Sequence, residues 1–276
     1  MFRPVAREQH HTDHWRVKLV LHYDGRDFHG WQIQPGRRTV QGELSSLLGQ
    51  LFGDGASPVT GAGRTDQGVH ATGQVASTLV PARWTPDQLR KALNALAPSD
   101  LWIASAERVS LSFHPRYDAR SRTYVYHLGL GPEARSPFHA PFCWPLWQRL
   151  EIEPMRLLTA TIVGEHDFGA FAKAGQPERG VRCRVLSATW REGSGPTLDF
   201  EITADRYLHR MVRYLVGTLV DIGRGRRPVD EFARLLRGDP SLRVSPPAPP
   251  QGLLLTRVEY SKEHTESQFD AQGERG

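Results

Sequence analysis

The chain has 276 residues, 39% hydrophobic and 24% charged, so it is long enough for one large core or two smaller ones. These proportions exclude an intrinsically disordered chain and a collagen-like repeat. No run approaches the roughly 18 consecutive apolar residues of a membrane-spanning helix, and the N-terminal residues lack the apolar segment of a signal peptide. We therefore expect a cytoplasmic protein that does not act at a membrane.

The charge balance is basic, with 35 lysine and arginine residues against 30 aspartate and glutamate residues, and only four of the 35 are lysines. The planar guanidinium group binds phosphate through paired hydrogen bonds and stacks on bases, which favours a nucleic-acid partner. A coding bias toward arginine explains the composition equally well, so charge alone leaves the partner open.

Cysteine and histidine spacing gives no sign of a metal site or a disulfide framework. Cys143 and Cys183 are too few for a framework and lack C-x-x-C spacing, so we expect reduced, buried thiols. His10, His11 and His14 lie in a polar segment, and a solvated tail explains them better than metal binding does.

The first half of the chain alternates strands and helices. Apolar residues at period two from Val17 to Tyr23 predict a strand, and helical spacing over residues 40–51 predicts a helix that Thr39 caps. Three further elements are predicted in the same rhythm: a strand at 73–80, a helix at 86–96 and a strand at 101–109.

The second half also alternates strands and helices. Its predicted elements are strands at 123–130, 181–190, 197–204 and 253–260, helices at 154–163 and 229–236, and a long helix from Leu208. The Pro- and Gly-rich residues 245–252 predict an extended connector.

Short turns between strands favour an α+β fold with mainly antiparallel sheets and helices on one face. We expect two ferredoxin-like or RNA-recognition-motif-like (RRM-like) halves at residues 15–115 and 116–260, between flexible tails at 1–14 and 261–276.

The densest chemical signal is the segment GAGRTDQGVHATG from Gly61 to Gly73, with four glycines in 13 positions. Glycine permits left-handed angles and close approach to a ligand, although an ordinary turn would also use it. Asp66 lies near Arg64, and a neighbouring guanidinium favours an ionised carboxylate that can act as nucleophile or base. No P-loop ending, G-x-S-x-G motif or metal-binding histidine spacing is present, which argues against hydrolase and metal chemistry.

The predicted helix from Leu208 has an apolar stripe and a basic face. The stripe consists of Leu208, Met211, Val212, Leu215, Leu219 and Ile222. Arg206, Arg210 and Arg213 fall on another face, at spacings of four and three. That face is either solvated or turned toward a cleft, and we favour the cleft.

The segment GAGRTDQGVHATGQV resembles the signature of the tRNA pseudouridine synthase A family. Similar blocks follow in the family's order over residues 15–260: YDGRDFHGWQIQ, TVQGEL, RTYVYHL, GEHDFGAF, ADRYLHRMVRYLVGTLVDIGRG and GLLLTRVEY. The resemblance implies isomerisation of uridine to pseudouridine at tRNA positions 38, 39 and 40, in the anticodon stem-loop, with no cofactor or metal. It also implies a homodimer whose two α+β halves are joined around a central catalytic cleft, with tRNA and not DNA as partner.

The resemblance also assigns roles to residues. Asp66 matches the catalytic aspartate, Tyr124 an active-site tyrosine that packs on uracil, and Arg213 an arginine that pairs with the aspartate. Arg64 matches an arginine expected to contact the RNA, and we expect Arg206 and Arg210 to contact the RNA as well. Whether Asp66 attacks C1′, adds to C6 or removes a proton is left open.

Other residues fit the pattern less closely. Tyr207 stands where phenylalanine is common and Leu254 where tyrosine is common, which affects pocket shape more than activity. His166 and Phe168 match family positions, but we expect them to be packing residues.

Two rival functions remain at this stage. An RNA-binding module of the same fold would not turn over its ligand, although it would have no need of a carboxylate beside an anionic polymer. A uridine-directed hydrolase would share the aspartate but release free uracil.

Overall fold

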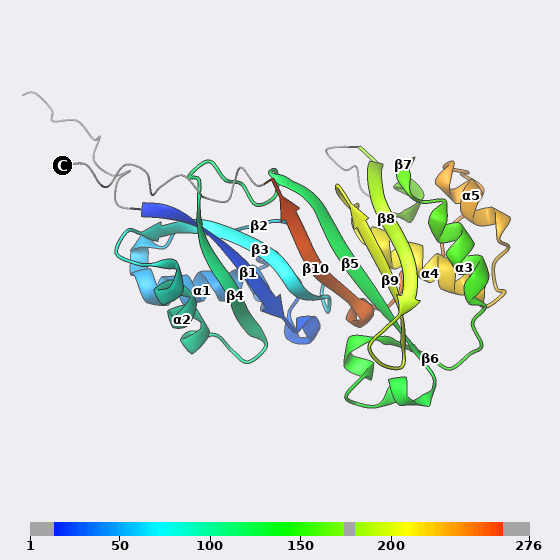
Figure 1. Cartoon of the computed structure of the whole chain (residues 1–276), viewed down its shortest axis with the longest axis horizontal. Helices are drawn as coiled ribbons and strands as arrows, with labels where there is room; N and C mark the ends of the chain where they lie inside the picture. Colours follow the sequence, from blue (N-terminus) through cyan, green and yellow to red (C-terminus); the bar gives the residue numbers. More distant parts are fainter. Residues whose placement is uncertain (1–13, 174–179, 262–276) are drawn as a thin grey trace, which may run out of the picture.

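The computed structural model describes residues 14–173 and 180–261. Within these ranges the strands form one 10-stranded sheet with the order β4-β1-β3-β10-β5-β9-β8-β7, to which β2 adds beside β3 and β6 beside β5 (Figure 1). Six short 3-10 helices lie in the connections, at Gly25–Asp27, Gly53–Gly55, Pro132–Arg135, Ala140–Phe142, Gly169–Phe171 and Pro250–Gly252.

The N-terminal part of the sheet is antiparallel. Its strands are β1 (His14–Tyr23), β2 (Thr60–Gly61), β3 (His70–Pro81) and β4 (Leu101–Val109). Every second residue of β1 is buried, as the period-two pattern predicts.

Two helices pack on this part of the sheet, α1 (Val40–Phe52) and α2 (Pro86–Leu96). The side chain of Thr39 accepts a hydrogen bond from the backbone N–H of Gly42, so the predicted cap is confirmed. Thr85 and Gln88 cap each other's backbone at the start of α2.

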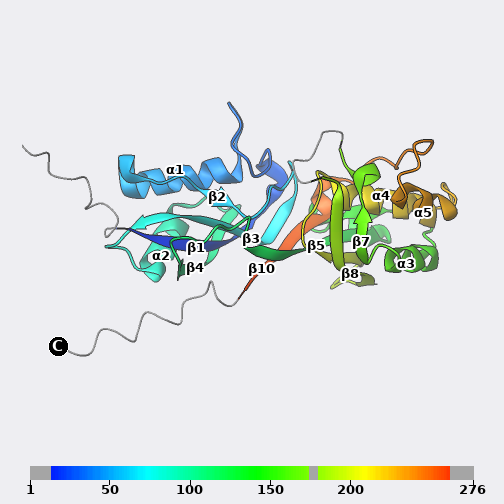
Figure 2. The ribbon, with the colours of Figure 1, turned by 90° about the horizontal axis from the view of Figure 1, so that it is seen from above.

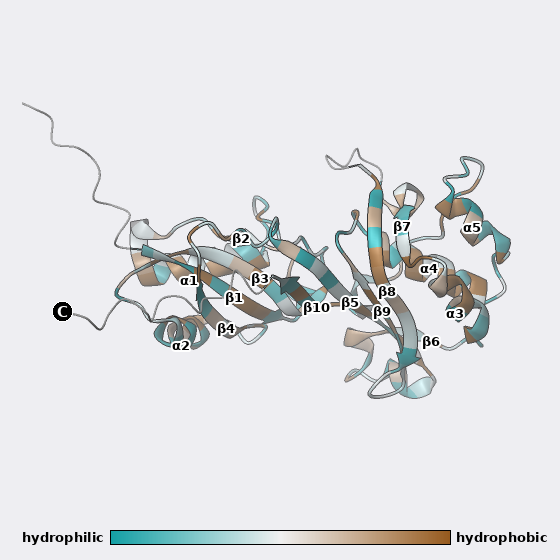
Figure 3. Cartoon of the chain, turned by 45° about the horizontal axis from the view of Figure 1, so that its top comes forward, coloured by the Kyte–Doolittle hydropathy of each residue, from teal (hydrophilic) through white to brown (hydrophobic). Residues whose placement is uncertain are grey.

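The C-terminal part combines five strands with three helices. Its strands are β5 (Ala119–Leu130), β6 (Trp144–Leu146), β7 (Gly164–Asp167), β8 (Arg182–Glu192) and β9 (Thr197–Ala204). Its helices are α3 (Ile152–Ala160), α4 (Met211–Gly223) and α5 (Asp230–Leu236), and they gather at the end of the molecule opposite α1 and α2 (Figures 1 and 2). Hydrophilic and hydrophobic residues alternate along β8, which is buried on one face only (Figure 3).

The last strand, β10 (Leu253–Tyr260), joins the two parts. It pairs antiparallel with β5 along its length and parallel with β3 at two positions, Leu254 with His70 and Leu255 with Ala71. The α+β class with mainly antiparallel strands is therefore confirmed, but the two halves share one continuous sheet instead of having one sheet each. The chain crosses between them in the stretch from Val109 to Ala119, which contains the predicted boundary.

The helix predicted from Leu208 begins at Met211, so the prediction of its basic face was wrong. Arg206 and Arg210 precede the helix, because Arg210 adopts a left-handed conformation that helical backbone cannot continue. The helix is also not amphipathic: 11 of its 13 residues are buried, including Arg213.

Other differences from the predictions are smaller. The helix predicted at 154–163 spans Ile152–Ala160, and β1 begins at His14, inside the predicted tail. The short strands β2, β6 and β7 were not predicted. His10 and His11 lie outside the described residues, as do most of the two predicted tails.

Cys143 and Cys183 are both free and buried, as predicted, and burial raises the pKa of the Cys183 thiol to about 11. In the described ranges, no helix combines the length and the apolar character needed to cross a bilayer.

Candidate active site

Asp66 lies on a loop of residues 62–69 between β2 and β3. Hydrogen bonds from the elements on both sides of it fix this loop. The Tyr23 hydroxyl lies 2.8 Å from Oγ1 of Thr65, and the backbone N–H of Trp31 donates to the Thr65 carbonyl at 3.1 Å. Nε2 of Gln74 donates to the Gly63 carbonyl at 3.0 Å. Burial raises the pKa of Tyr23 to about 12, so its hydroxyl remains neutral.

Close backbone contact explains three glycines of the YDGRDFHGW and GAGRTD blocks. A Cβ atom on Gly25 would lie 2.0 Å from the Val69 carbonyl oxygen, and one on Gly30 would lie 2.7 Å from the Thr65 carbonyl oxygen. A Cβ atom on Gly61 would meet the Trp31 ring at 2.4 Å. The two sequence blocks therefore form one packed unit around Asp66.

His70 ends the loop and is part of this unit. Its Nδ1 accepts a hydrogen bond from the backbone N–H of Gly25 at 3.1 Å, so Nδ1 carries no proton. Burial lowers the pKa of His70, although nearby Asp24 opposes this shift. His70 is thus a neutral structural residue.

The carboxylate of Asp66 faces three basic side chains. Nη1 of Arg213 donates to Oδ2 at 2.8 Å, and Nε of Arg210 lies 3.7 Å from the same oxygen. Nε2 of His209 lies 3.3 Å from Oδ1. The Asp66 side chain is 19% exposed and that of Arg213 is 10% exposed, so water screens this ion pair only weakly.

The connector at residues 245–252 positions Arg213. Nε of Arg213 donates to the Ala248 carbonyl at 2.7 Å, and the Ala248 N–H donates back to the Arg213 carbonyl at 2.9 Å. The Tyr126 hydroxyl donates to the Pro249 carbonyl at 2.8 Å and ties the connector to β5. The connector was predicted to be extended, but it ends in the 3-10 helix Pro250–Gly252. Its residue Ala248 orients the guanidinium group of Arg213.

Arg210 is the only described residue other than glycine with a positive φ, at 64°. Such a conformation costs roughly 1–2 kcal/mol for a residue with a Cβ atom. Nε of Arg210 is buried without a hydrogen-bond partner and faces the Asp66 carboxylate. The turn brings His209 and Arg210 to Asp66 together with the first turn of α4.

Tyr124 lies on β5, one strand away from the loop. Its register partner on β10 is Leu255, which also pairs with Ala71, so β10 sets the spacing between Tyr124 and the end of the loop. Its ring packs edge-on against Tyr207 with 5.0 Å between centroids. Burial raises the pKa of Tyr124, and the negative charge of Asp66 adds to the increase. The phenol is therefore neutral at ordinary pH.

Two neighbours of Tyr124 are structural in ways that the sequence did not predict. The Tyr207 hydroxyl lies 3.0 Å from the Arg122 carbonyl and 2.9 Å from the Ile202 carbonyl. The hydroxyl that distinguishes this tyrosine from the phenylalanine common at this position therefore has hydrogen-bond acceptors. The Arg122 guanidinium donates to four carbonyls, including that of Ala62 beside the loop. These bonds commit Arg122 to the fold.

The predicted RNA-binding arginines divide into two groups. Arg64 is exposed, and no hydrogen bond or ion pair within the described ranges holds its side chain. Arg206 donates to the carbonyls of Gly180 and Arg182, away from Asp66. The structure therefore brings together Asp66, Arg210 and Arg213, with Tyr124 nearby, and places Arg206 outside this cluster.

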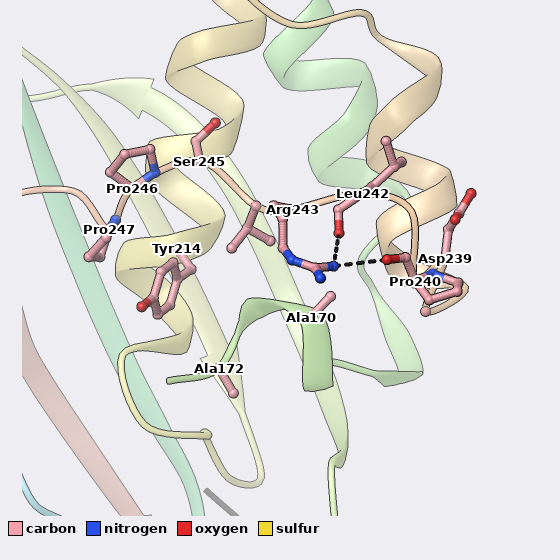
Figure 4. Close-up of a pocket in the computed structure, with 12 residues that line it drawn as sticks. Ala170, Ala172, Tyr214, Asp239, Pro240, Leu242, Arg243, Ser245, Pro246 and Pro247 are labelled. Carbon is pink, nitrogen blue, oxygen red and sulfur yellow. Dashed lines mark hydrogen bonds between the residues drawn. The ribbon is translucent and has the colours of Figure 1, made fainter. Parts of the chain in front are cut away.

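An open depression of about 560 Å³ lies beside α4, between Tyr214 and residues 238–247 (Figure 4). Arg243 lies at its side, where Nη1 donates to the carbonyls of Pro240 and Leu242. Asp66, Tyr124 and Arg213 do not line this depression. In the described part of the chain, no cluster of His, Cys, Asp and Glu side chains could hold a metal ion.

The family model described as tRNA pseudouridine synthase matches residues 19–118 and 159–261. The chain belongs to this family. The tRNA pseudouridine synthase A of Geobacter sp. (strain M21) is 38% identical over 245 residues, which cover 88% of this chain and 98% of that protein. The protein of the same name from Myxococcus xanthus is 39% identical and covers 89% and 92% of the two chains. The family resemblance and the enzyme class expected from the motifs, a pseudouridine synthase, are thereby confirmed.

The solved archaeal box H/ACA sRNP Nop10-Cbf5 complex aligns with 74% of this chain and 42% of that chain, at a TM-score of 0.32 and 12% identity. That similarity is too low to inform the site.

His209 is the residue near Asp66 that sequence reasoning did not single out. A signal for it was present, because in the predicted helix positions 209 and 213 are four residues apart and would share a face. A signal for Arg122 was present: Arg122, Tyr124 and Tyr126 alternate along one strand, so they share a face.

Proposed function

We propose that this chain isomerises uridine to pseudouridine at positions 38, 39 and 40 of tRNA, in the anticodon stem-loop, with Asp66 as the catalytic carboxylate. The observation that carries the proposal is the weakly exposed Asp66–Arg213 ion pair, held at the line where the two parts of the sheet join. Membership of the tRNA pseudouridine synthase family supports tRNA as the substrate.

The reaction balances without a co-reactant. The bond between N1 of uracil and C1′ of ribose breaks, the base turns while it stays bound, and a bond forms between C5 and C1′. The proton on C5 leaves, and N1 takes up a proton. Nothing is oxidised or reduced, so the protein need supply only a carboxylate, a site that holds the base, and exclusion of water.

The residues around Asp66 fit these needs. Arg213 fixes the position of the carboxylate through a 2.8 Å hydrogen bond from Nη1 to Oδ2. The neutral ring of Tyr124 offers a surface on which uracil can pack, with its own orientation held by Tyr207.

The substrate nucleotide must leave its helical stack before it reaches this site. The deep major groove of an A-form helix admits no side chains, and extrusion of a nucleotide costs a few kcal/mol. Arg64 and Arg210 are the arginines near Asp66 whose terminal nitrogens are uncommitted in the described ranges, and we propose that they bind phosphates of the RNA. The motifs further support a homodimer, and the tRNA substrate supports a cytoplasmic location.

The proposal predicts that Asp66→Asn abolishes turnover. The substitution removes the negative charge but keeps the size of the side chain, so the rate of pseudouridine formation should fall at least about 1,000-fold. The assay uses a tRNA transcript tritiated at uridine C5 and measures tritium released to water. Asp27→Asn is the matched control, because Asp27 is an exposed carboxylate on the Gly25–Asp27 turn, and it should keep the wild-type rate.

The same assay separates the rival functions. Free uracil in place of tritiated water would identify a hydrolase, and neither product despite tRNA binding would identify a binding module. Asp66→Asn activity close to that of wild type would contradict the assignment of the carboxylate.

A further inference from the structure

We infer that Tyr126 is a positioning residue for the reaction, because it holds the connector at residues 245–252 in the place where this connector fixes Arg213 against Asp66. The inference rests on the proposed function and goes beyond it, since the hydroxyl of Tyr126 is bonded to the connector and not to the carboxylate. Tyr126 thus controls the position of the Arg213 guanidinium, and not its charge.

The two members of the ion pair come from distant parts of the chain. Asp66 and Arg213 are 147 residues apart in the sequence, so contacts between their elements must set the distance between the two side chains. The connector contacts both elements. Ala248 is hydrogen-bonded to Arg213, and a Cβ atom on Gly68 of the Asp66 loop would lie 3.0 Å from Cγ of Pro250. The connector therefore lies between the loop that carries the carboxylate and the arginine that binds it.

Ala248 holds Arg213 at two points through its backbone. Its carbonyl accepts a hydrogen bond from Nε of Arg213 at 2.7 Å, and its N–H donates to the Arg213 carbonyl at 2.9 Å. Nη1 of the same guanidinium reaches Oδ2 of Asp66 at 2.8 Å. Because the guanidinium is planar and rigid, a displacement of the Ala248 carbonyl also moves Nη1. The geometry of the ion pair therefore depends on where the connector lies.

The connector is stiff, because four of its eight residues are prolines, whose rings fix the backbone angle φ. A stiff segment moves as a unit, so a shift at one point reaches its neighbours. Helix α4 supports the connector from one side. A Cβ atom on Gly217 would lie 2.2 Å from the Pro246 carbonyl oxygen, which means that the connector lies directly against the helix at this glycine.

Tyr126 holds the connector between its two contacts. Its hydroxyl donates at 2.8 Å to the carbonyl of Pro249, the residue between Ala248 and Pro250. The Tyr126 side chain is fully buried, and Gly252 leaves room for its ring, since a Cβ atom there would lie 2.7 Å from Cζ. Prolines have no N–H, so they cannot donate the backbone hydrogen bonds that would otherwise fix the connector. A side-chain donor takes over this role.

Loss of this hydroxyl should slow the reaction without weakening tRNA binding. In Tyr126→Phe the ring still fills its space, but the Pro249 carbonyl loses its donor, so the connector shifts and Arg213 moves relative to Asp66. The single-turnover rate of tritium release, with enzyme in excess over C5-tritiated tRNA, should fall about 10-fold. The Kd for tRNA rests on phosphate contacts and should stay within about twofold of wild type.

Tyr260→Phe is the matched control. The Tyr260 hydroxyl also donates to a proline carbonyl at 2.8 Å, that of Pro115, but Tyr260 is the last residue of β10 and its ring packs on Phe113. This variant loses the same kind of hydrogen bond away from the connector, so its single-turnover rate should stay within about twofold of wild type.

A double-mutant cycle with Arg213→Lys tests whether Tyr126 acts through Arg213. Lysine keeps the positive charge but has no Nε to bind the Ala248 carbonyl, so the connector no longer orients the cation. Tyr126→Phe should therefore lower the single-turnover rate by less than about twofold in the Arg213→Lys background, against about 10-fold in wild type. A hydroxyl with a purely structural role would lower both rates by the same factor.

Gly217→Ala displaces the connector from the side of α4 and replaces Tyr126→Phe in the cycle if that variant fails to fold by circular dichroism. Its Cβ atom would press on the Pro246 carbonyl, so the same pair of effects is expected.

Three results would overturn the inference. They are a Tyr126→Phe rate within about twofold of wild type, an equal fall in the rate of Tyr260→Phe, and an equal fall in the wild-type and Arg213→Lys backgrounds. The comparison with Tyr260→Phe decides the question even where Arg213→Lys is too slow for a further fall to be measured. Release of no tritium by wild type would instead contradict the proposed function.

Discussion

The two segments that meet at Asp66 are built in opposite ways. The loop at 62–69 is held by neutral hydrogen bonds and by close contacts, with backbone at Gly25 and Gly30 and with the Trp31 ring at Gly61, that leave no room for a Cβ atom. The approach to α4 instead contains a strained residue, Arg210, and the half-exposed side chain of His209.

This difference assigns the two segments different tasks. The loop fixes the position of the carboxylate, since its contacts involve main-chain atoms that cannot rearrange singly. The approach to α4 supplies basic side chains that face the carboxylate. The carboxylate thus lies between Arg213, which is 10% exposed, and the more exposed side chains of Arg210 and His209.

In this comparison, the largest loss of stability should come from adding a side-chain atom where the loop at 62–69 is closely packed. Gly25→Ala would place a Cβ atom 2.0 Å from the Val69 carbonyl oxygen, so the loop must shift. We expect the free energy of unfolding to fall by about 1–3 kcal/mol and the rate of pseudouridine formation to fall at least about 10-fold. Urea denaturation and the tritium assay measure the two effects.

Gly63→Ala is the control for this experiment. A Cβ atom on Gly63 would meet no heavy atom within 4 Å, and its φ is not in the left-handed region. Its free energy of unfolding should stay within about 0.5 kcal/mol of wild type. Equal loss of stability in both variants would mean that close packing does not fix the loop.

A smaller effect should come from relieving the strain at Arg210. Arg210→Gly and Arg210→Ala both remove the guanidinium, but only glycine accepts a φ of 64° without steric cost. The glycine variant should therefore be more stable to urea than the alanine variant by about 1 kcal/mol. Both should bind tRNA more weakly than wild type and to the same extent.

Filter binding at fixed salt concentration measures this affinity. Equal stability of the two variants would show that position 210 is not left-handed. Affinities that differ between them would mean that the backbone, and not the lost cation, determines RNA binding.

The smallest effect should be the contribution of His70 to the pH dependence of the free energy of unfolding. Burial lowers the pKa of His70 in the folded protein, so the unfolded chain takes up a proton at this residue before the folded one does as the pH falls below about 6.5. By linkage, that difference favours unfolding at low pH, and wild type should lose stability between pH 7.5 and 5.5.

His70→Asn tests this contribution, because the amide oxygen can still accept the Gly25 N–H but does not titrate. Urea denaturation at the two pH values should show a smaller loss for the variant than for wild type. An equal loss of stability in the variant and in wild type would mean that residues other than His70 cause the pH dependence.

Much of the site could be predicted from local sequence. The glycine-rich segment singled out Asp66 as a candidate, the family block that contains Met211 singled out Arg213, and the cap at Thr39 marked the start of α1. Each of these features depends on residues that are close in sequence, for which propensity and spacing are informative. The prediction failed at residues 206–210, since periodicity continued the helix while a single left-handed residue ended it.

The sequence by itself determined the fold class, the family blocks and the residues able to carry the chemistry. Only the tertiary structure decided that β10 lies between β3 and β5, that Ala248 orients Arg213, and that His209 faces the second oxygen of Asp66. Arg213 and Ala248 are 35 residues apart in the sequence. Asp66 and His209 are 143 residues apart, and His70 and Leu254 are 184 residues apart. Pairing over such separations depends on how the whole sheet closes, and no local pattern of side chains encodes it.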